Sequence, residues 1–376
     1  MLIAILAAAV AATSVVPRPA DSLDALMGPG ISRELAVYRA ARISHVSYDL
    51  SLDVTGHDTA WGRVTIRFDR ADTGDVILDF RGLALDHAEA NGRALAPLVA
   101  NGAHVRIPAA ALVRGTNTLA FRFAAGIAAA GQSIIRVHDR TDGADYLYTL
   151  LVPADANALF PCFDQPDLKA RVALTLTTPR AWRAVANGAL VRADTAASAI
   201  TYHFARTEPI STYLIAFAAG PWATFTARDR APGRAMTLYV RASRAKEVEA
   251  DTLLALNARA RAWLERYFGI AYPFGKFDIV LAPAFPFGGM EHPGAIFYNE
   301  ESFIYRERPT LTQRLGREAT IFHEVTHQWF GDDVTMQWFD DLWLKEGFAT
   351  YMAAKMQAAL DPRADAWKMF YLRNKP

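Results

Sequence analysis

Two histidines near the end of the sequence are spaced so that they could bind one metal ion. His323 and His327 are four positions apart in the segment IFHEVTHQWFG, and Glu324 directly follows the first histidine. Residues four apart lie one turn above each other on the same face of an α-helix, so both imidazoles can reach one Zn²⁺. Glu324 lies about 100° around the helix. It is therefore expected beside the open position of the metal, where a general base acts.

Glu346 is the candidate for the third ligand. It follows His327 after 18 intervening residues, in the predicted helix DLWLKEGFATYMAAKMQAAL. A loop over 332–340 lets the chain reverse, so the second helix can cross the first and bring this carboxylate to the same ion. Gly347, the next residue, predicts a close approach between the two helices. Three protein ligands and one open position are typical of catalytic zinc, whereas structural zinc usually has four protein ligands.

The elements that must position these residues fall into two regions. The first runs from about His45 to Trp222. Within that region short runs alternate between apolar and polar residues, which predicts an all-β sandwich or saddle. Its core-facing positions are predicted to be Val46, Tyr48, Leu50, Leu52 and Val54, then Val64, Ile66 and Phe68, then Leu119, Phe121 and Phe123, then Val172, Leu174 and Leu176. The rest of the chain is predicted to be α+β, with strands at 277–283 and 295–300 and helices at 245–269, 315–330 and 342–360.

Composition excludes several classes of protein. The 376 residues are 52% hydrophobic, which is ample for packed cores and excludes a disordered chain. Lys and Arg number 40 and Asp and Glu number 39, so no field of one sign attracts nucleic acid, and no nucleic-acid partner is expected. The single cysteine, Cys162, excludes an intrachain disulfide.

The chain begins with the apolar run MLIAILAAAVAA. This run is too short to span a bilayer, and no stable membrane span is predicted elsewhere. It indicates a secretory signal peptide over 1–20, which predicts a periplasmic or secreted protein. Because no Lys or Arg lies between Met1 and the run, an apolar N-terminal helix in a cytoplasmic protein is the alternative.

Five motifs resemble those of the zinc aminopeptidases of the aminopeptidase N type, the gluzincins with an HExxH-x18-E pattern. They occur in family order as FPCFDQP (160–166), YFGIAYPFGKFD (267–278), FGGMEHPGAIFY (287–298), HEVTHQWFG (323–331) and WLKEGFA (343–349). The resemblance implies a thermolysin-like catalytic domain and one Zn²⁺ per chain, held by His323, His327 and Glu346. It also implies that Glu324 is the general base and that peptides with a free N-terminus lose their N-terminal amino acids.

The third motif is similar to the family's G-x-M-E-N exopeptidase motif. The resemblance implies that Glu291 binds the substrate's α-ammonium group, and that the edge formed by Gly288, Gly289 and Met290 hydrogen-bonds the peptide. His292 replaces the asparagine of the family.

Two further departures from the family concern the substrate's amine and the oxyanion. Val152 stands at about the position where the family usually has a Gln or Glu that contacts the amine. The family's tyrosine for the oxyanion lies well downstream of the zinc helices, beyond Pro376. We therefore expect the chain to stop within the catalytic domain.

The predicted organisation is a signal peptide at 1–20, an extension at 21–42, an all-β N-terminal domain at 43–222 and a thermolysin-like catalytic domain at 223–376 that lacks its C-terminal part. The predicted function is that of a zinc metalloaminopeptidase. The alternative is a zinc-binding fragment of weak or no activity that serves as a peptide-binding or structural module. A thermolysin-like endopeptidase is disfavoured, because the carboxylate of Glu291 would oppose a chain continuing in that direction.

Overall fold

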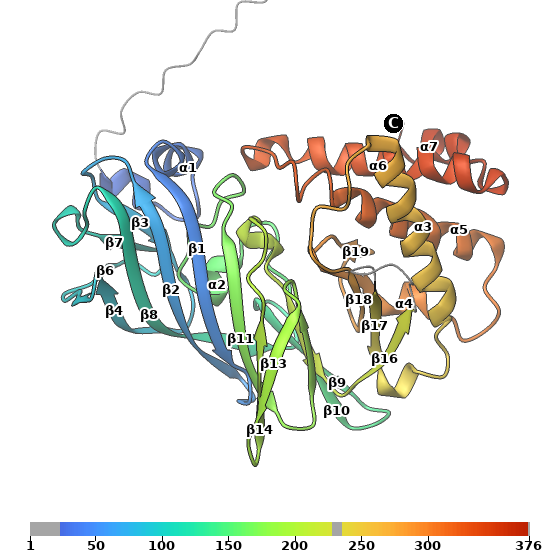
Figure 1. Cartoon of the computed structure of the whole chain (residues 1–376), viewed down its shortest axis with the longest axis horizontal. Coiled ribbons are helices and arrows are strands. Elements are labelled where there is room, and N and C mark those ends of the chain that lie inside the picture. Colours follow the sequence, from blue (N-terminus) through green and yellow to red (C-terminus); the bar gives the residue numbers. More distant parts are fainter. Residues whose placement is uncertain (1–22, 228–234, 375–376) are drawn as a thin grey trace, which may run out of the picture.

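The computed structural model describes residues 23–227 and 235–374, so the predicted signal peptide at 1–20 lies outside the described residues. A β-rich N-terminal half stands beside a half in which helices cover a smaller sheet (Figure 1). The predicted fold class, a β-rich domain followed by an α+β domain, is confirmed.

The N-terminal half contains a 12-stranded sheet and a 3-stranded sheet. The large sheet consists of β1 (Ile43–Asp53), β2 (Thr59–Arg70), β4 (Ala84–Ala90), β5 (Arg93–Ala94), β8 (Gly115–Ala128), β9 (Ile134–Asp139), β10 (Ala144–Thr149), β11 (Arg171–Pro179), β12 (Arg183–Ala186), β13 (Leu190–Thr195), β14 (Ala199–Phe204) and β15 (Phe217–Gly220). The small sheet consists of β3 (Val76–Asp79), β6 (Val99–Ala100) and β7 (His104–Ile107), and two helices, α1 (Arg33–Ala40) and α2 (Ala156–Leu159), accompany them.

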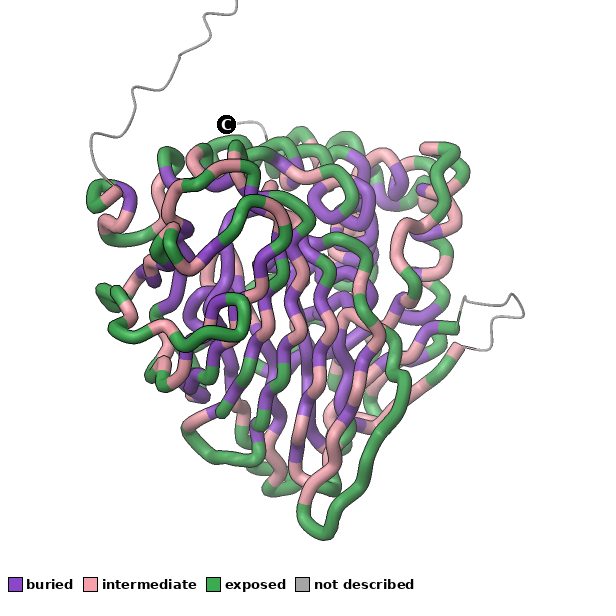
Figure 2. The backbone as a smooth tube through the Cα atoms, turned by 60° about the vertical axis from the view of Figure 1, so that its left-hand side comes forward, coloured by how far each residue is buried: buried purple, intermediate pink, exposed green. Residues whose placement is uncertain are grey.

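The order in the large sheet is β12-β15-β10-β9-β8-β2-β1-β11-β14-β13, with β4 also paired to β8 and β5 to β4. Its pairs are antiparallel except β1 with β11 and β8 with β9, which are parallel. Every apolar position predicted to face the core is at most 5% exposed. The alternation of buried and more exposed residues is visible along the long strands in Figure 2. Burying each such side chain contributes about 1.5–3 kcal/mol, which is why the alternation determines the inward face.

The C-terminal half is a five-stranded sheet with helices packed against it (Figure 1). Its strands, in sheet order, are β16 (Trp222–Ala227), β17 (Met236–Arg241), β18 (Asp278–Ala282), β20 (Ala295–Asn299) and the edge strand β19 (Gly289–Met290). Its helices are α3 (Ala250–Phe268), α4 (Glu300–Phe303), α5 (Leu311–His327), α6 (Trp343–Leu360) and α7 (Ala366–Asn374). None of the helices within 23–227 and 235–374 has the length and apolar character needed to cross a membrane.

Local sequence signals set the helix ends. Gly269 ends α3 in the left-handed conformation with φ of 67°, as the sequence predicted. Helix α5 starts at Leu311 rather than at 315, because Thr310 and Gln313 form a capping box that satisfies the first free N–H groups.

A buried ion pair attaches α1 to the small sheet. Arg39 is fully buried and donates two hydrogen bonds to the carboxylate of Asp79, at 2.7 and 2.6 Å. His104 lies 2.8 Å from the same carboxylate, and the backbone N–H of Asp164 donates to it at 2.9 Å. The carboxylate of Asp79 therefore joins α1 and the FPCFDQP segment to the small sheet.

Asp164 of this segment accepts a hydrogen bond of 2.7 Å from the hydroxyl of Thr212, which also belongs to the N-terminal half. A lysine just after the segment reaches the C-terminal half. Lys169 donates from Nζ to the backbone carbonyls of Asp332 and Asp333, at 2.7 and 2.6 Å. Those two residues form the turn after α5, so the N-terminal half holds the end of that helix.

We predict that Arg39→Met lowers the free energy of unfolding by about 3–5 kcal/mol, because it leaves the buried carboxylate of Asp79 without its main counter-charge. Arg33→Met is the matched control on the same helix. Arg33 is two-thirds exposed and 3.8 Å from Asp340, so its loss should change stability by about 1 kcal/mol or less. Urea denaturation of the two variants and the parent measures both effects, and equal losses would contradict the role given to Arg39.

Candidate metal centre

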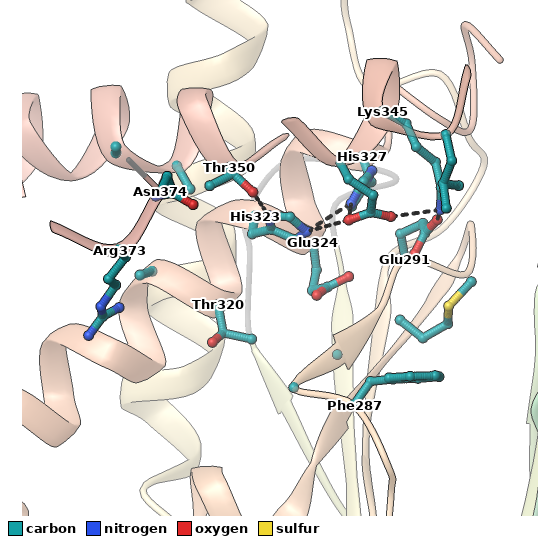
Figure 3. Close-up of a pocket in the computed structure, with 18 of the residues that line it drawn as sticks. Phe287, Glu291, Thr320, His323, Glu324, His327, Lys345, Thr350, Arg373 and Asn374 are labelled. Atoms are coloured by element: carbon teal, nitrogen blue, oxygen red, sulfur yellow. Dashed lines mark hydrogen bonds and ion pairs between the residues drawn. The ribbon is translucent and has the colours of Figure 1, made fainter. Parts of the chain in front are cut away.

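A cavity of about 660 Å³ separates the two halves and is lined from both. Helices α5, α6 and α7 and strand β19 form most of its wall, and the N-terminal half contributes Val152, Pro153 and Tyr213. His323, Glu324, His327, Glu291 and Lys345 converge on this cavity (Figure 3). Every residue that the sequence proposed for the site lines the cavity.

The three predicted metal ligands come together. The Nε2 atoms of His323 and His327 are 3.0 Å apart. Oε2 of Glu346 lies 3.3 Å from the first of these nitrogens and 3.5 Å from the second. The first two residues share one face of α5, and α6 crosses that helix to supply the carboxylate.

Ligand atoms about 2.0–2.2 Å from a tetrahedral divalent ion lie about 3.3–3.6 Å from one another. The two separations from Glu346 lie in this range, and the two ring nitrogens, 3.0 Å apart, are slightly closer than that geometry requires. Two imidazoles and one carboxylate are also the donor set of a catalytic zinc site with one position left open. The residues present therefore fit the metal that the sequence predicts.

The outer ring nitrogens fix the orientation of the imidazoles. Nδ1 of His327 is 2.9 Å from the backbone carbonyl of Phe330, so it carries the proton and donates. Nδ1 of His323 is 3.3 Å from the hydroxyl of Thr350. The contact with the carbonyl leaves the lone pair of the His327 Nε2 directed at the shared point, and the Thr350 hydroxyl, when it accepts a hydrogen bond from Nδ1, does the same for His323.

Glu324 is buried beside the ligands. It is 5% exposed, and its carboxylate, a carboxylate oxygen of Glu291 and a ring nitrogen of His327 lie within 4.8 Å of one another. Burial raises the pKa of Glu324 above its usual value, and the charge of Glu291 acts in the same direction. A carboxylate that readily takes up a proton is suited to general base catalysis.

Glycine at position 289 allows this carboxylate to lie close to β19. A Cβ atom on Gly289 would be 2.5–2.7 Å from side-chain atoms of Glu324. Gly288 is less crowded, since its Cβ would be 3.4 Å from Thr320. Gly288, Gly289 and Met290 all line the cavity, and β19 is the edge strand of its sheet, so an extended peptide could lie along it.

Lys345 was missed by the sequence prediction. Its ammonium group forms an ion pair with Oε1 of Glu291 and lies 3.1 Å from Oε1 of Glu346. Burial opposes ionisation of Glu291, but the charge of Lys345 lowers the pKa of that carboxyl to about 2. Burial alone would lower the pKa of Lys345, but the charge of Glu291 outweighs burial, so the pKa of Lys345 is raised. The only sequence signal was a basic residue next to a predicted ligand.

Two of the departures from the family pattern, Val152 and His292, lie in different surroundings. Val152 lines the cavity, where its apolar side chain offers no hydrogen bond. His292 is fully buried outside the cavity lining, and its ring packs against Phe297 with the centroids 4.6 Å apart. Burial lowers the pKa of His292 to about 3, so its ring is neutral and supports the loop.

The interpretation of Gly347 was wrong. The sequence predicted that this glycine permits close approach of α5 and α6, but a Cβ atom there would meet no described atom within 4 Å outside its own helix turns. The tight approach occurs instead at Gly331, with φ of 130°, where a Cβ would lie 3.2 Å from the ring of His327 and 3.3 Å from the stem of Lys345.

Both halves of the chain match known proteins. The Peptidase M1 N-terminal domain matches residues 44–214, and the Peptidase family M1 domain matches residues 254–376. The chain is similar to aminopeptidase N of Streptomyces lividans, with 33% identity over 339 residues, which is 88% of this chain and 39% of that protein. It is also similar to leucyl aminopeptidase of Saccharolobus solfataricus, with 32% identity over 58% of this chain and 27% of that protein. Endoplasmic reticulum aminopeptidase 1 of Rattus norvegicus is 35% identical over 59% of this chain and 24% of its own length.

The chain thus spans less than half the length of each of these relatives.

We predict that the full chain binds one equivalent of Zn²⁺, and that Glu346→Gln weakens the affinity, because an amide is a poorer ligand than a carboxylate. Zinc at 100 times its dissociation constant should stabilise the parent protein by about 2.7 kcal/mol. Metal analysis after dialysis measures the bound zinc, and thermal unfolding with and without zinc measures the stabilisation. The control is Glu307→Gln, which changes an exposed glutamate that precedes α5. Equal zinc retention by the two variants would exclude Glu346 as a ligand.

Proposed function

The chain belongs to the peptidase M1 family, and from that premise we propose that it is a zinc-dependent aminopeptidase. It would hydrolyse the first peptide bond of a substrate with a free N-terminus and release the N-terminal amino acid. The names of its relatives support this proposal, because those in Streptomyces lividans, Saccharolobus solfataricus and Rattus norvegicus are all aminopeptidases.

One observation carries the proposal: Glu291, whose carboxylate can bind the substrate's α-ammonium group, lies next to the candidate base Glu324. Oxygens of Glu291 and Glu324 lie within 4.8 Å of each other and of the ring of His327. Within an amino acid, the α-nitrogen and the carbonyl carbon are only about 2.5 Å apart. An α-ammonium group bound to Glu291 would therefore hold the first carbonyl of the substrate at Glu324 and the metal ligands.

His323, His327 and Glu346 would hold the zinc ion, which when bound polarises the scissile carbonyl and makes water more acidic. Glu324 would accept the proton of the attacking water and then transfer it to the leaving amine. Glu291 would bind the α-ammonium through a charge-assisted hydrogen bond. The β19 edge would align the peptide backbone beside these groups.

The buried charge of Glu291 favours exopeptidase over endopeptidase activity. Glu291 is 3% exposed, so little water is available to solvate its carboxylate. A substrate that continued past this point would place an uncharged amide against the free oxygen of Glu291. A free α-ammonium instead makes a charge-assisted hydrogen bond there.

We predict that N-acetylation of a peptide lowers kcat/KM by at least about 10- to 100-fold, because it removes a charge-assisted hydrogen bond of about 1.5–3 kcal/mol. Glu324→Gln should lower kcat by about 10²–10⁴-fold while one zinc is retained, because the amide cannot accept a proton. Turnover of free and acetylated peptides by the parent, Glu324→Gln and Glu307→Gln measures both effects. Equal cleavage of the two peptides would exclude an aminopeptidase, and a fully active Glu324→Gln would exclude that residue as the base.

We further predict that Gly289→Ala lowers kcat by about 10²-fold, since the new methyl group must displace the carboxylate of Glu324 and an error of about 1 Å has that effect. Zinc content should not change. Gly347→Ala is the matched control, because its methyl group meets open space. Alanine there should retain activity and stabilise α6 by up to about 1 kcal/mol. A fully active Gly289→Ala variant would show that this close contact is not required.

A further inference from the structure

Lys345 contacts both of the carboxylates that flank the metal ligands. It is 6% exposed, so its ammonium group has almost no water around it. Nζ forms an ion pair with Oε1 of Glu291 and lies 3.1 Å from Oε1 of Glu346. One side chain thus links the carboxylate proposed for the substrate's amine to the carboxylate proposed for the metal.

The two oxygens of each carboxylate have different surroundings. In Glu346, Oε1 faces Lys345 and Oε2 faces the nitrogens of His323 and His327, at 3.3 and 3.5 Å. In Glu291, Oε1 faces Lys345, and none of the hydrogen bonds among residues 23–227 and 235–374 involves Oε2. Because Glu291 lines the cavity, Oε2 is available to a ligand. In each carboxylate Lys345 therefore holds Oε1, and Oε2 remains available to bind the substrate's amine in Glu291 or the metal in Glu346.

Lys345 is itself held in place. Its ammonium group lies 4.9 Å from the ring centroid of Tyr213, which belongs to the N-terminal half. Its aliphatic stem passes Gly331 so closely that a Cβ atom there would be 3.3 Å from Cδ. A cation fixed on both sides can fix the carboxylates that it contacts.

We propose that Lys345 is the positioning residue of the amine subsite. Its ammonium group, held by one oxygen of Glu346, binds one oxygen of Glu291 and so aims the second oxygen of Glu291 at the substrate's α-ammonium. This inference rests on the proposed aminopeptidase function and adds a residue to it. In this role Lys345 acts on the substrate through Glu291.

The test compares Lys345→Met, which keeps the length but removes the charge, with Lys345→Arg, which keeps the charge. Lys345→Gln is studied in parallel, so that a misfolded Met variant does not end the comparison. Lys355→Met is the matched control, because Lys355 lies on the same helix and also lies over a tyrosine ring, 5.0 Å from the centroid of Tyr267. The zinc content of each full-length variant is measured. Calorimetry then gives the dissociation constants of L-leucine hydroxamate and of its N-acetyl form.

We expect the parent protein and Lys355→Met to prefer the free amine. In Lys345→Met and Lys345→Gln the free hydroxamate should bind about 10- to 100-fold more weakly, because its charge-assisted hydrogen bond to Glu291 is lost. The affinity of the N-acetyl form should change little and one zinc should remain. Lys345→Arg should restore part of the preference. With leucine p-nitroanilide as substrate, the same variants should show a raised KM and a smaller change in kcat.

Three outcomes would overturn the proposal: an unchanged preference in Lys345→Met and Lys345→Gln, an equal weakening of both hydroxamates, or a loss of zinc from these variants. A failure of the proposed function gives a different result, since the parent protein itself would then bind the two hydroxamates equally. If the parent prefers the free amine and the uncharged variants keep that preference, only the role of Lys345 is wrong.

Discussion

The site depends on burying several carboxylates without leaving their charge uncompensated. Glu291 and Glu324 are at most 5% exposed, and a buried carboxylate without a partner costs several kcal/mol. Glu291 and Glu346 bring two negative charges, of which Lys345 balances one. Burial raises the pKa of Glu324 and of the nearby Asp332, so both take up a proton more readily than usual. A divalent cation between the histidines would balance the remaining charge and favour the ionised form of Glu324, which makes the metal part of the charge balance as well as of the chemistry.

The N-terminal half helps to build the site. Tyr213 covers Lys345, and Lys169 holds the turn after α5 through two backbone carbonyls. Asn187 donates to the carbonyl of Pro293 at 3.0 Å, close to Glu291 along the chain. Gly294 packs so closely against Asn187 that a Cβ atom would be 2.2 Å from its carbonyl oxygen. The β-rich half therefore fixes the loop that carries Glu291, and the two halves form one binding site.

Local patterns predicted what depends on local geometry. The alternation in β1 predicted its buried face, Gly269 predicted the end of α3, and the spacing of His323 and His327 predicted two rings facing one point. Pairs formed across the fold were not predicted. Lys345 and Glu291 are 54 residues apart, and Arg39 and Asp79 are 40 apart.

No periodicity encodes such pairs, because each charge needs a partner whose position only the tertiary structure determines. The error at Gly347 has the same origin, since a glycine in a helix does not reveal which atoms face it.

The start of α6 explains how adjacent residues can serve two purposes. Successive residues on a helix point about 100° apart, so Glu346 can face the histidines while Lys345 faces Glu291 and Tyr213. A glutamate in the first turn interacts favourably with the helix dipole, whereas a lysine there does not. The position of Lys345 in that turn therefore conflicts with local preference and is stabilised by the carboxylate of Glu291 from another element. Such conflicts between local and tertiary preference are expected at functional sites. A shift of α6 by one residue would place either Lys345 or Gly347 where Glu346 now lies, so the helix register fixes the metal ligand and the amine subsite together.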